Sequence, residues 1–210
     1  MLNYILKLIY PEVCGICNKI HNENLCQSCE SKIKKYEINK FTIKQNIEMI
    51  NVYKYDGIIR EKIIEYKFQD KSYLYKTFAK MILKNEKICG FFEKYDIIIP
   101  VPIHKKRKAQ RGYNQVELIA KELSKNTNLK LENNVLIKQK NIISQSELNK
   151  NQRKQNIKDA FKIINVEKIE NKKVLLIDDI YTTGSTINEC CKTLKKAKIE
   201  KIGILTIAKD

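Results

Sequence analysis

Short apolar runs alternate along the chain with longer segments in which apolar residues recur every three or four positions. The short runs predict β-strands at Met49–Tyr55, Tyr95–Val101, Val174–Ile177 and Ile202–Ala208. The longer segments have helical spacing and predict α-helices at Ile58–Phe68, Tyr73–Ile88, Gly112–Asn126 and Ile187–Lys196. The run Val174–Ile177 is apolar throughout, which is typical of a strand buried on both faces of a parallel sheet. We therefore expect an α/β fold with a parallel sheet flanked by helices.

A polar, mixed stretch at residues 31–46 separates this pattern from a cysteine-rich first part of the chain. The 210 residues allow one domain of ordinary size and a small attachment. We expect a small unit at residues 1–40 and a larger domain at residues 41–210.

The residues after the buried run Val174–Ile177 carry the clearest chemical signal. Two adjacent carboxylates, Asp178 and Asp179, end the predicted strand, and a hydroxyl-rich turn leads into the next helix: Thr182, Thr183, Gly184, Ser185 and Thr186. A helix N-terminus offers unpaired N–H groups and the positive end of the helix dipole, which suit a phosphate. The carboxylates would repel a phosphate, so we expect them to face the vicinal hydroxyls of a sugar or a hydrated Mg²⁺. Together these features describe a site for a ribose 5-phosphate.

The competing interpretation is an ordinary strand-to-helix connection in which a threonine or serine caps the helix. A cap needs one such residue, whereas four hydroxyls surround Gly184 here. The turn also differs from the phosphate loop of nucleoside triphosphatases, because it lacks the lysine and its acids precede the loop. The sugar-phosphate interpretation therefore explains more of the motif.

Four of the seven cysteines form two Cys-x-x-Cys pairs, separated by eight residues: Cys14, Cys17, Cys26 and Cys29. This spacing is typical of a structural zinc site with four thiolate ligands in a small ribbon. Disulfides and a thioredoxin-like redox pair are the alternatives, although nothing in the sequence indicates export and two pairs so close together favour a metal. His21 lies between the pairs and could replace one cysteine, but we expect a surface residue. We expect the remaining cysteines in the core: Cys89, Cys190 and Cys191.

Two further segments are candidates for binding anions. Two prolines stiffen the end of the predicted strand at Tyr95–Val101, and residues 104–111 then carry a dense set of cations that includes Arg107 and Arg111. Such an arrangement suits pyrophosphate, and a solvated basic loop that contacts nucleic-acid phosphates is the alternative. Residues 144–156, which include Arg153, are polar, and we expect a mobile loop that closes over the ligand.

The whole chain carries a formal net charge of +17. This charge favours anionic partners, namely nucleic acid, phosphorylated metabolites or an acidic membrane surface. The lysines are spread along the chain, however, so a compositional bias without function explains the charge equally well. We expect no membrane span and no signal peptide, because residues 1–10 are apolar but short and contain Lys7.

Residues 174–186 resemble the phosphoribosyl-pyrophosphate (PRPP) motif of the type I phosphoribosyltransferases. Combined with the cysteine pairs, the segments around His104 and Gln115, and residues 145–156, the chain resembles the ComF family, in which a zinc ribbon precedes a phosphoribosyltransferase domain. The resemblance implies that Asp178 and Asp179 contact the ribose hydroxyls, with Mg²⁺, and that Thr182–Thr186 surround the 5′-phosphate. It also implies a cytoplasmic protein linked to DNA uptake in naturally transformable bacteria.

Three functions stay open at this point. The first is a phosphoribosyltransferase that displaces pyrophosphate from C1 of PRPP, with Arg107, Arg111 and Arg153 on the pyrophosphate side. The second is a protein that binds PRPP or a nucleotide without turnover. The third is a factor that handles single-stranded DNA, with a competence helicase as a candidate partner. Nothing in the sequence identifies an acceptor, and we expect the hood that covers it to come from residues 31–90 or from the cysteine unit.

Overall fold

The structure is a computed structural model that describes residues 11–44, 47–140 and 157–210. The helices are α2 (Gln27–Lys34), α3 (Gly57–Phe68), α4 (Leu74–Leu83), α5 (Glu86–Phe92), α6 (Lys105–Arg111), α7 (Gln115–Lys125) and α9 (Ser185–Leu194), with a short 3₁₀ turn at Val166–Lys168. The strands are β1 (Glu37–Lys44), β2 (Ile47–Lys54), β3 (Ile97–Pro100), β4 (Lys130–Leu131), β5 (Leu136–Lys138), β6 (Phe161–Ile163), β7 (Lys173–Tyr181) and β8 (Lys201–Lys209).

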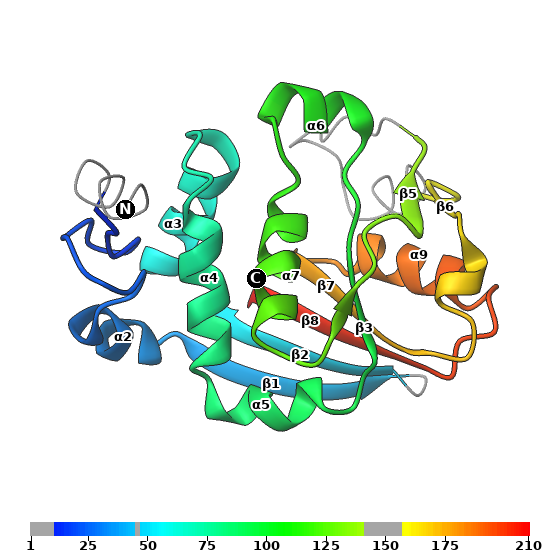
Figure 1. Ribbon diagram of the computed structural model, residues 1–210, viewed down its shortest axis with the longest axis horizontal. Coiled ribbons are helices and arrows are strands. Elements are labelled where there is room, and N and C mark those ends of the chain that lie inside the picture. Colours follow the sequence, from blue (N-terminus) through cyan, green and yellow to red (C-terminus); the bar gives the residue numbers. More distant parts are fainter. Residues whose placement is uncertain (1–10, 45–46, 141–156) are drawn as a thin grey trace, which may run out of the picture.

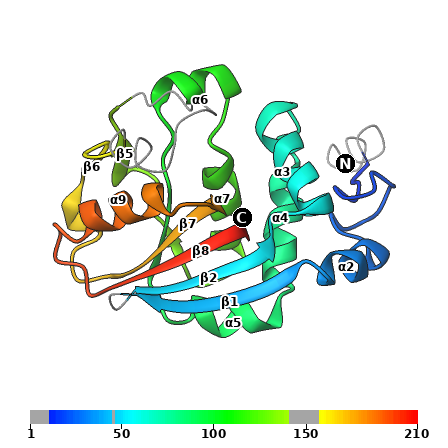
Figure 2. The same cartoon turned by 180° about the vertical axis from the view of Figure 1, so that it is seen from behind.

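In the described part of the chain, a six-stranded sheet has the order β1-β2-β8-β7-β3-β4. The pairs β2–β8, β8–β7, β7–β3 and β3–β4 are parallel, and only the edge pair β1–β2 of this sheet is antiparallel. Helices α4 and α7 lie on one face of the sheet and α9 on the other (Figures 1 and 2). The α/β fold with a parallel sheet flanked by helices is thus confirmed.

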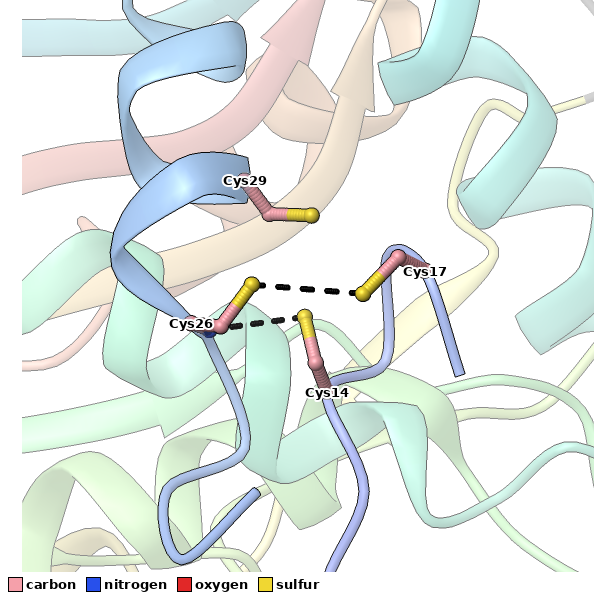
Figure 3. A group of neighbouring side chains, drawn as sticks. All are labelled: Cys14, Cys17, Cys26 and Cys29. Atoms are coloured by element: carbon pink, nitrogen blue, oxygen red, sulfur yellow. Dashed lines mark hydrogen bonds between the residues drawn. The ribbon is translucent and has the colours of Figure 1, made fainter. Parts of the chain in front are cut away.

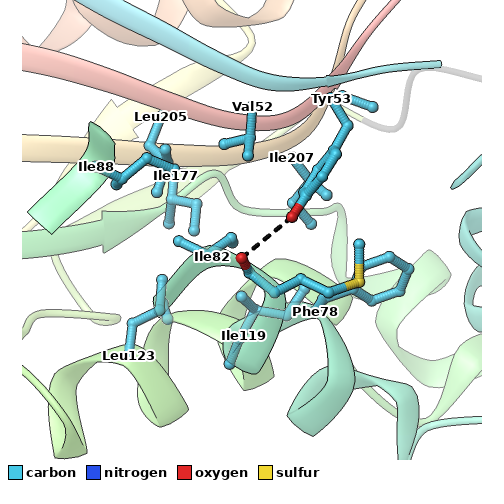
Figure 4. Packing of buried hydrophobic residues seen from close by; sticks show 14 of the residues in the cluster. Val52, Tyr53, Phe78, Ile82, Ile88, Ile119, Leu123, Ile177, Leu205 and Ile207 are labelled. Carbon is cyan, nitrogen blue, oxygen red and sulfur yellow. Dashed lines mark hydrogen bonds between the residues drawn. The ribbon is translucent and has the colours of Figure 1, made fainter. Parts of the chain in front are cut away.

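Strand β7 shows why this arrangement forms. Its side chains alternate between two buried clusters: Leu175 and Ile177 pack with α4 and α7, whereas Val174 and Leu176 pack with α9. All four are fully buried, as the apolar run predicts for a strand with both faces covered. Figure 4 shows the first cluster, where the Tyr53 hydroxyl also donates a hydrogen bond to the backbone carbonyl of Met81 at 3.1 Å.

Several predicted boundaries are wrong. Strand β7 does not end at the acid pair but continues to Tyr181, because its backbone stays paired with β8 up to Lys209. The single helix expected at Tyr73–Ile88 is two helices, since the buried Asn85 accepts a hydrogen bond from the Lys87 N–H and so starts α5. The basic segment after Val101 is a helix, α6, and not a loop.

The polar stretch at residues 31–46 contains the end of α2 and the edge strand β1. Within the described residues β1 pairs with one strand, β2, and its apolar side chains Phe41 and Ile43 are 51% and 76% exposed. An edge strand with so little burial lacks the hydrophobic pattern of a central strand, which is why it was not predicted. The division at residue 40 stays a prediction, and β1 runs across that position.

The cysteine-containing unit packs against the helices of the larger part. Leu25 and Ile33 belong to the same buried cluster as Phe78 of α4, and the Thr77 hydroxyl donates a hydrogen bond to the Asn24 carbonyl at 3.0 Å. The two parts therefore share one hydrophobic core. Across the described residues, every helix is too short or too polar to serve as a membrane span.

Candidate functional site

The hydroxyl-rich turn joins the carboxyl end of β7 to the N-terminus of α9. Gly184 precedes α9 with φ +73°, a left-handed conformation that residues with a Cβ atom rarely adopt. A Cβ atom at this position would lie 2.5 Å from the Tyr181 hydroxyl oxygen, so the turn also has no space for one. The hydroxyls of Thr183 and Ser185 lie 2.9 Å apart. The turn can offer N–H and O–H donors to a phosphate at the start of α9.

Asp179 is held by two side chains from elements far away in the sequence. The Lys67 ammonium, at the end of α3, lies 2.8 Å from one carboxylate oxygen, and the Gln115 side-chain amide donates to the other at 2.7 Å. Burial alone would raise the pKa of Asp179, but Lys67 and Gln115 outweigh it, and the pKa is lowered. Asp179 is therefore an ionised hydrogen-bond acceptor at neutral pH.

Asp178 has a different protonation equilibrium. Burial, and then the negative charge of Asp179, raise the pKa of Asp178 to about 7. One Asp178 oxygen also accepts a hydrogen bond from the Asp179 backbone N–H at 2.9 Å. The two neighbouring acids thus differ in charge near neutral pH, a property that the sequence does not reveal.

Helix α6 brings cations to the same place. His104 starts α6 by accepting a hydrogen bond from the Lys106 N–H, and Gly112 ends it in the left-handed conformation. The Arg111 guanidinium then donates to the Gln115 side-chain oxygen. Since the other end of Gln115 contacts Asp179, the predicted residues Arg111 and Asp179 are linked through one amide.

An open hollow of about 610 Å³ lies between the end of α3 and helix α6. Residues at and after the end of α3 line one side, and residues of α6 and the start of α7 line the other: Lys67, Phe68 and Asp70, and Arg107, Gln110, Arg111 and Gln115. The Arg111 guanidinium lies 5.5 Å from the centroid of the Phe68 ring, and burial lowers the pKa of Arg111.

Sequence reasoning missed three residues of this site. Lys67 and Phe68 carry no local signal, because they occupy the last turn of an ordinary helix. Lys138, on β5, was also missed: burial, and then the charge of Arg107, lower its pKa, while Cys190 and then Asp178 raise it. Gln115 lies within a segment that carries the family resemblance and could have been found there. Arg153 and the predicted mobile loop at residues 144–156 lie outside the described residues.

The cysteine cluster occupies the other part of the molecule (Figure 3). The sulfur atoms of Cys14, Cys17, Cys26 and Cys29 all lie within 4.8 Å of one another. Tetrahedral zinc with Zn–S bonds of about 2.3 Å needs sulfurs about 3.8 Å apart, which is close to this spacing. Cys26 Sγ lies 3.9 Å from Cys17 Sγ. The four cysteines therefore fit the predicted metal site.

The thiols of the cluster differ in their electrostatics, since burial, and then the neighbouring cysteines, raise the pKa of Cys29. Burial opposes ionisation of Cys14, but hydrogen bonds from nearby backbone N–H groups, led by that of Cys26, lower its pKa to about 7. The Nδ1 atom of His21 makes a local contact, since it lies within hydrogen-bond distance of the Glu23 N–H at 3.1 Å. Cys190 and Cys191 are buried in the cluster around α9, as predicted for core cysteines. The side chain of Cys89 is outside the described part.

The fold and the strand–acid–turn–helix site define a phosphoribosyltransferase-type protein with an added four-cysteine unit. Residues 109–210 match the phosphoribosyl transferase domain family. Competence protein F from Haemophilus influenzae is 30% identical over 206 residues, which cover 94% of this chain and 90% of that protein. The chain therefore belongs to the ComF family of competence proteins, and the resemblance seen in the sequence is confirmed.

Two other similarities are weaker. Competence protein ComFC from Bacillus subtilis is 25% identical, over 98% of this chain and 81% of that protein. Among solved structures, adenine phosphoribosyltransferase from Thermoanaerobacter pseudethanolicus has a TM-score of 0.40 and 12% identity, over 86% of this chain and 99% of that one.

Proposed function

We propose that this protein binds PRPP together with Mg²⁺ and transfers the phosphoribosyl group to an acceptor, with displacement of pyrophosphate at C1. The observation that carries the proposal is the link Arg111–Gln115–Asp179 beside the turn at Thr182–Thr186. It joins a cation to a buried carboxylate at the carboxyl edge of a parallel sheet, where ligands of such folds bind.

Each part of the site has a task in this proposal. The hydroxyl-rich turn binds the 5′-phosphate, and Asp178 and Asp179 accept hydrogen bonds from the ribose hydroxyls. Arg107, Arg111 and Arg153 are proposed to bind the pyrophosphate. Mg²⁺, when bound, would supply additional positive charge for the leaving group. The transition state at C1 has oxocarbenium character, so catalysis depends mainly on positioning and on charge.

The cysteine cluster is proposed to hold zinc in a structural role. All four ligand positions of a tetrahedral ion would be filled by thiolates, which leaves none open for a substrate. Zinc would hold the start of α2, where Cys26 and Cys29 lie, against the turn that carries Cys14 and Cys17. Thiolate ligands persist in a reducing compartment, and we place the protein in the cytoplasm.

Calorimetric titration of Mg²⁺·PRPP into the zinc-loaded protein tests the proposal. A double variant, Asp178→Asn/Asp179→Asn, keeps the shape of both side chains and removes their charge. We expect it to bind at least about tenfold more weakly, because a hydrogen bond to a charged group contributes roughly 1.5–3 kcal/mol. The matched control is Asp159→Asn, an exposed acid at φ +52°, a conformation that asparagine tolerates. No binding of PRPP to the parent protein would refute the proposal.

A second candidate function is the handling of single-stranded DNA, with a competence helicase as a partner. The net charge of +17 and the competence-named relatives favour this alternative. DNA affinity should then fall steeply with salt concentration. It should also persist in the Asp178→Asn/Asp179→Asn variant, which separates DNA binding from PRPP binding. DNA affinity that is absent at low salt would contradict this alternative.

A further inference from the structure

The hollow between α3 and α6 adjoins the site proposed for the ribose. Lys67 and Gln115 line the hollow, and the same two side chains contact Asp179 at 2.8 and 2.7 Å. Only one layer of side chains therefore separates the hollow from the carboxylate that is proposed to hold the sugar. A ligand in the hollow would lie next to a ribose on Asp179.

The hollow contains an aromatic surface that packing does not require. Phe68 ends α3 with 72% of its surface exposed, although a large apolar side chain is normally buried. The Arg111 guanidinium stacks near one face of the ring, at 5.5 Å from its centroid. An exposed ring that is held beside a cation is a platform on which another planar ring can stack.

The walls of the hollow carry an excess of positive charge. Among the described residues, its lining includes Lys67, Arg107 and Arg111 but only one carboxylate, that of Asp70. If Arg107 and Arg111 contact the pyrophosphate of PRPP, Lys67 is the cation that remains for an acceptor. A ribose bound to Asp179 would share the carboxylate oxygens with Lys67. The Lys67 ammonium would then have N–H donors left for an anionic group in the hollow.

We propose that this hollow is the acceptor pocket and that it takes a planar aromatic ring bearing a negative charge, such as a heterocyclic carboxylate. Phe68 supplies the stacking surface, and Lys67 binds the anionic substituent. The hood of this protein is then the end of α3, which lies within the residues 31–90 expected to provide it. This inference rests on the proposed function, because an acceptor has meaning only beside a phosphoribosyl donor.

Two matched pairs of probe ligands test the inference: nicotinate against nicotinamide, and orotate against uracil. Each pair differs in a carboxylate and keeps a similar ring. Calorimetric titrations into the full-length zinc-loaded protein are made with and without saturating Mg²⁺·PRPP. We expect at least one carboxylate to bind about tenfold more tightly than its neutral counterpart, as a charge-assisted hydrogen bond predicts.

Two variants assign the effect to the hollow. Phe68→Ala should weaken binding of both members of a pair by at least about fivefold, because stacking is lost. Lys67→Met should remove the preference for the carboxylate and keep the stacking. The control is Phe41→Ala on β1, another exposed phenylalanine that lies outside the lining of the hollow, and we expect unchanged binding.

The outcomes separate this inference from the proposed function. If PRPP binds but none of the four probes does, or if the neutral probes bind as tightly as the carboxylates, the inference is overturned and the proposed function stands. Unchanged binding in Phe68→Ala would also overturn it. If PRPP does not bind but the probes show the expected dependence on Phe68 and Lys67, the pocket stands and the transferase function fails.

Discussion

Three glycines allow the geometry of the phosphate turn to be tested by single substitutions to alanine. Gly184 has φ +73°, and a Cβ atom there would collide with the Tyr181 side chain. Gly112, at the end of α6, has φ +81°, but the position that a Cβ atom would take has no neighbouring atom within 4 Å. Gly90 lies within α5 and has equally open space around it, without a left-handed φ. A side chain at Gly184 would therefore meet both backbone strain and a collision, one at Gly112 backbone strain alone, and one at Gly90 neither.

The expected losses of stability follow from these differences. Gly112→Ala should cost about 1–2 kcal/mol, the usual penalty of a left-handed conformation for a residue with a Cβ atom. Gly184→Ala carries the same penalty and must also displace the Tyr181 ring, whose contact with the Lys209 ammonium, at 5.7 Å, contributes roughly 0.5–1 kcal/mol. Gly90→Ala should stabilise the protein by about 0.5–1 kcal/mol, because alanine is the better helix former.

Thermal and urea unfolding of the zinc-loaded protein measure all three variants. One kcal/mol shifts the Tm of a chain of this size by about 2–4 °C, so Gly184→Ala should lower the Tm by about 3–12 °C. Adding Tyr181→Ala to Gly184→Ala should reduce the cost of the glycine substitution, since the collision is removed and only the strain stays. Equal stability of Gly184→Ala and Gly90→Ala would refute the left-handed turn, and equal costs at Gly184 and Gly112 would refute the collision with Tyr181.

Three further predictions concern the metal cluster and the acid pair. The purified protein should contain one zinc per chain, measured with a colorimetric chelator. Cys29→Ser should lose this zinc, whereas the control Cys190→Ser should keep it. Equal zinc content in the two variants would contradict a metal site at the cysteine cluster. Lys67→Met removes a charge that lowers the pKa of Asp179. The ion pair stabilises the folded state fully above the pKa of an unfolded aspartate, and this stabilisation disappears as the pH falls through the pKa of Asp179 in the folded state. Urea unfolding should therefore show a deficit of about 1–3 kcal/mol at pH 7 that shrinks towards pH 3, whereas a deficit independent of pH would argue against the ion pair. A pKa of Asp178 raised to about 7 means that the folded state loses stability as the pH rises from about 4 to 7. The variant Asp178→Asn should therefore gain stability relative to the parent protein between pH 5 and pH 8. A difference in stability that does not change with pH would contradict the raised pKa.

Features that depend on neighbouring residues could be predicted from the sequence. The four apolar residues Val174–Ile177 are buried on both faces of the sheet, because alternate side chains of a central strand point to opposite layers. Cys14 and Cys17 lie at one short turn and Cys26 and Cys29 at the start of α2, so the short spacing brings the two members of each pair together, and all four sulfurs lie within 4.8 Å of one another. The edge strand β1 was missed, since its exposed residues Phe41 and Ile43 give no burial pattern.

By itself, the sequence determined the α/β class, the strand–acid–turn–helix motif and the two cysteine pairs, because each of these is encoded in residues close together along the chain. Only the tertiary structure placed Lys67 and Gln115 on Asp179 and Phe68 beside Arg111. These contacts join α3, α6, α7 and β7, which meet where the helices pack over the carboxyl edge of the sheet. No local pattern reports such a meeting, since it depends on how the whole chain packs. The contacts with Lys67 and Gln115 lower the pKa of Asp179 against the effect of burial, whereas burial and the charge of Asp179 raise the pKa of Asp178.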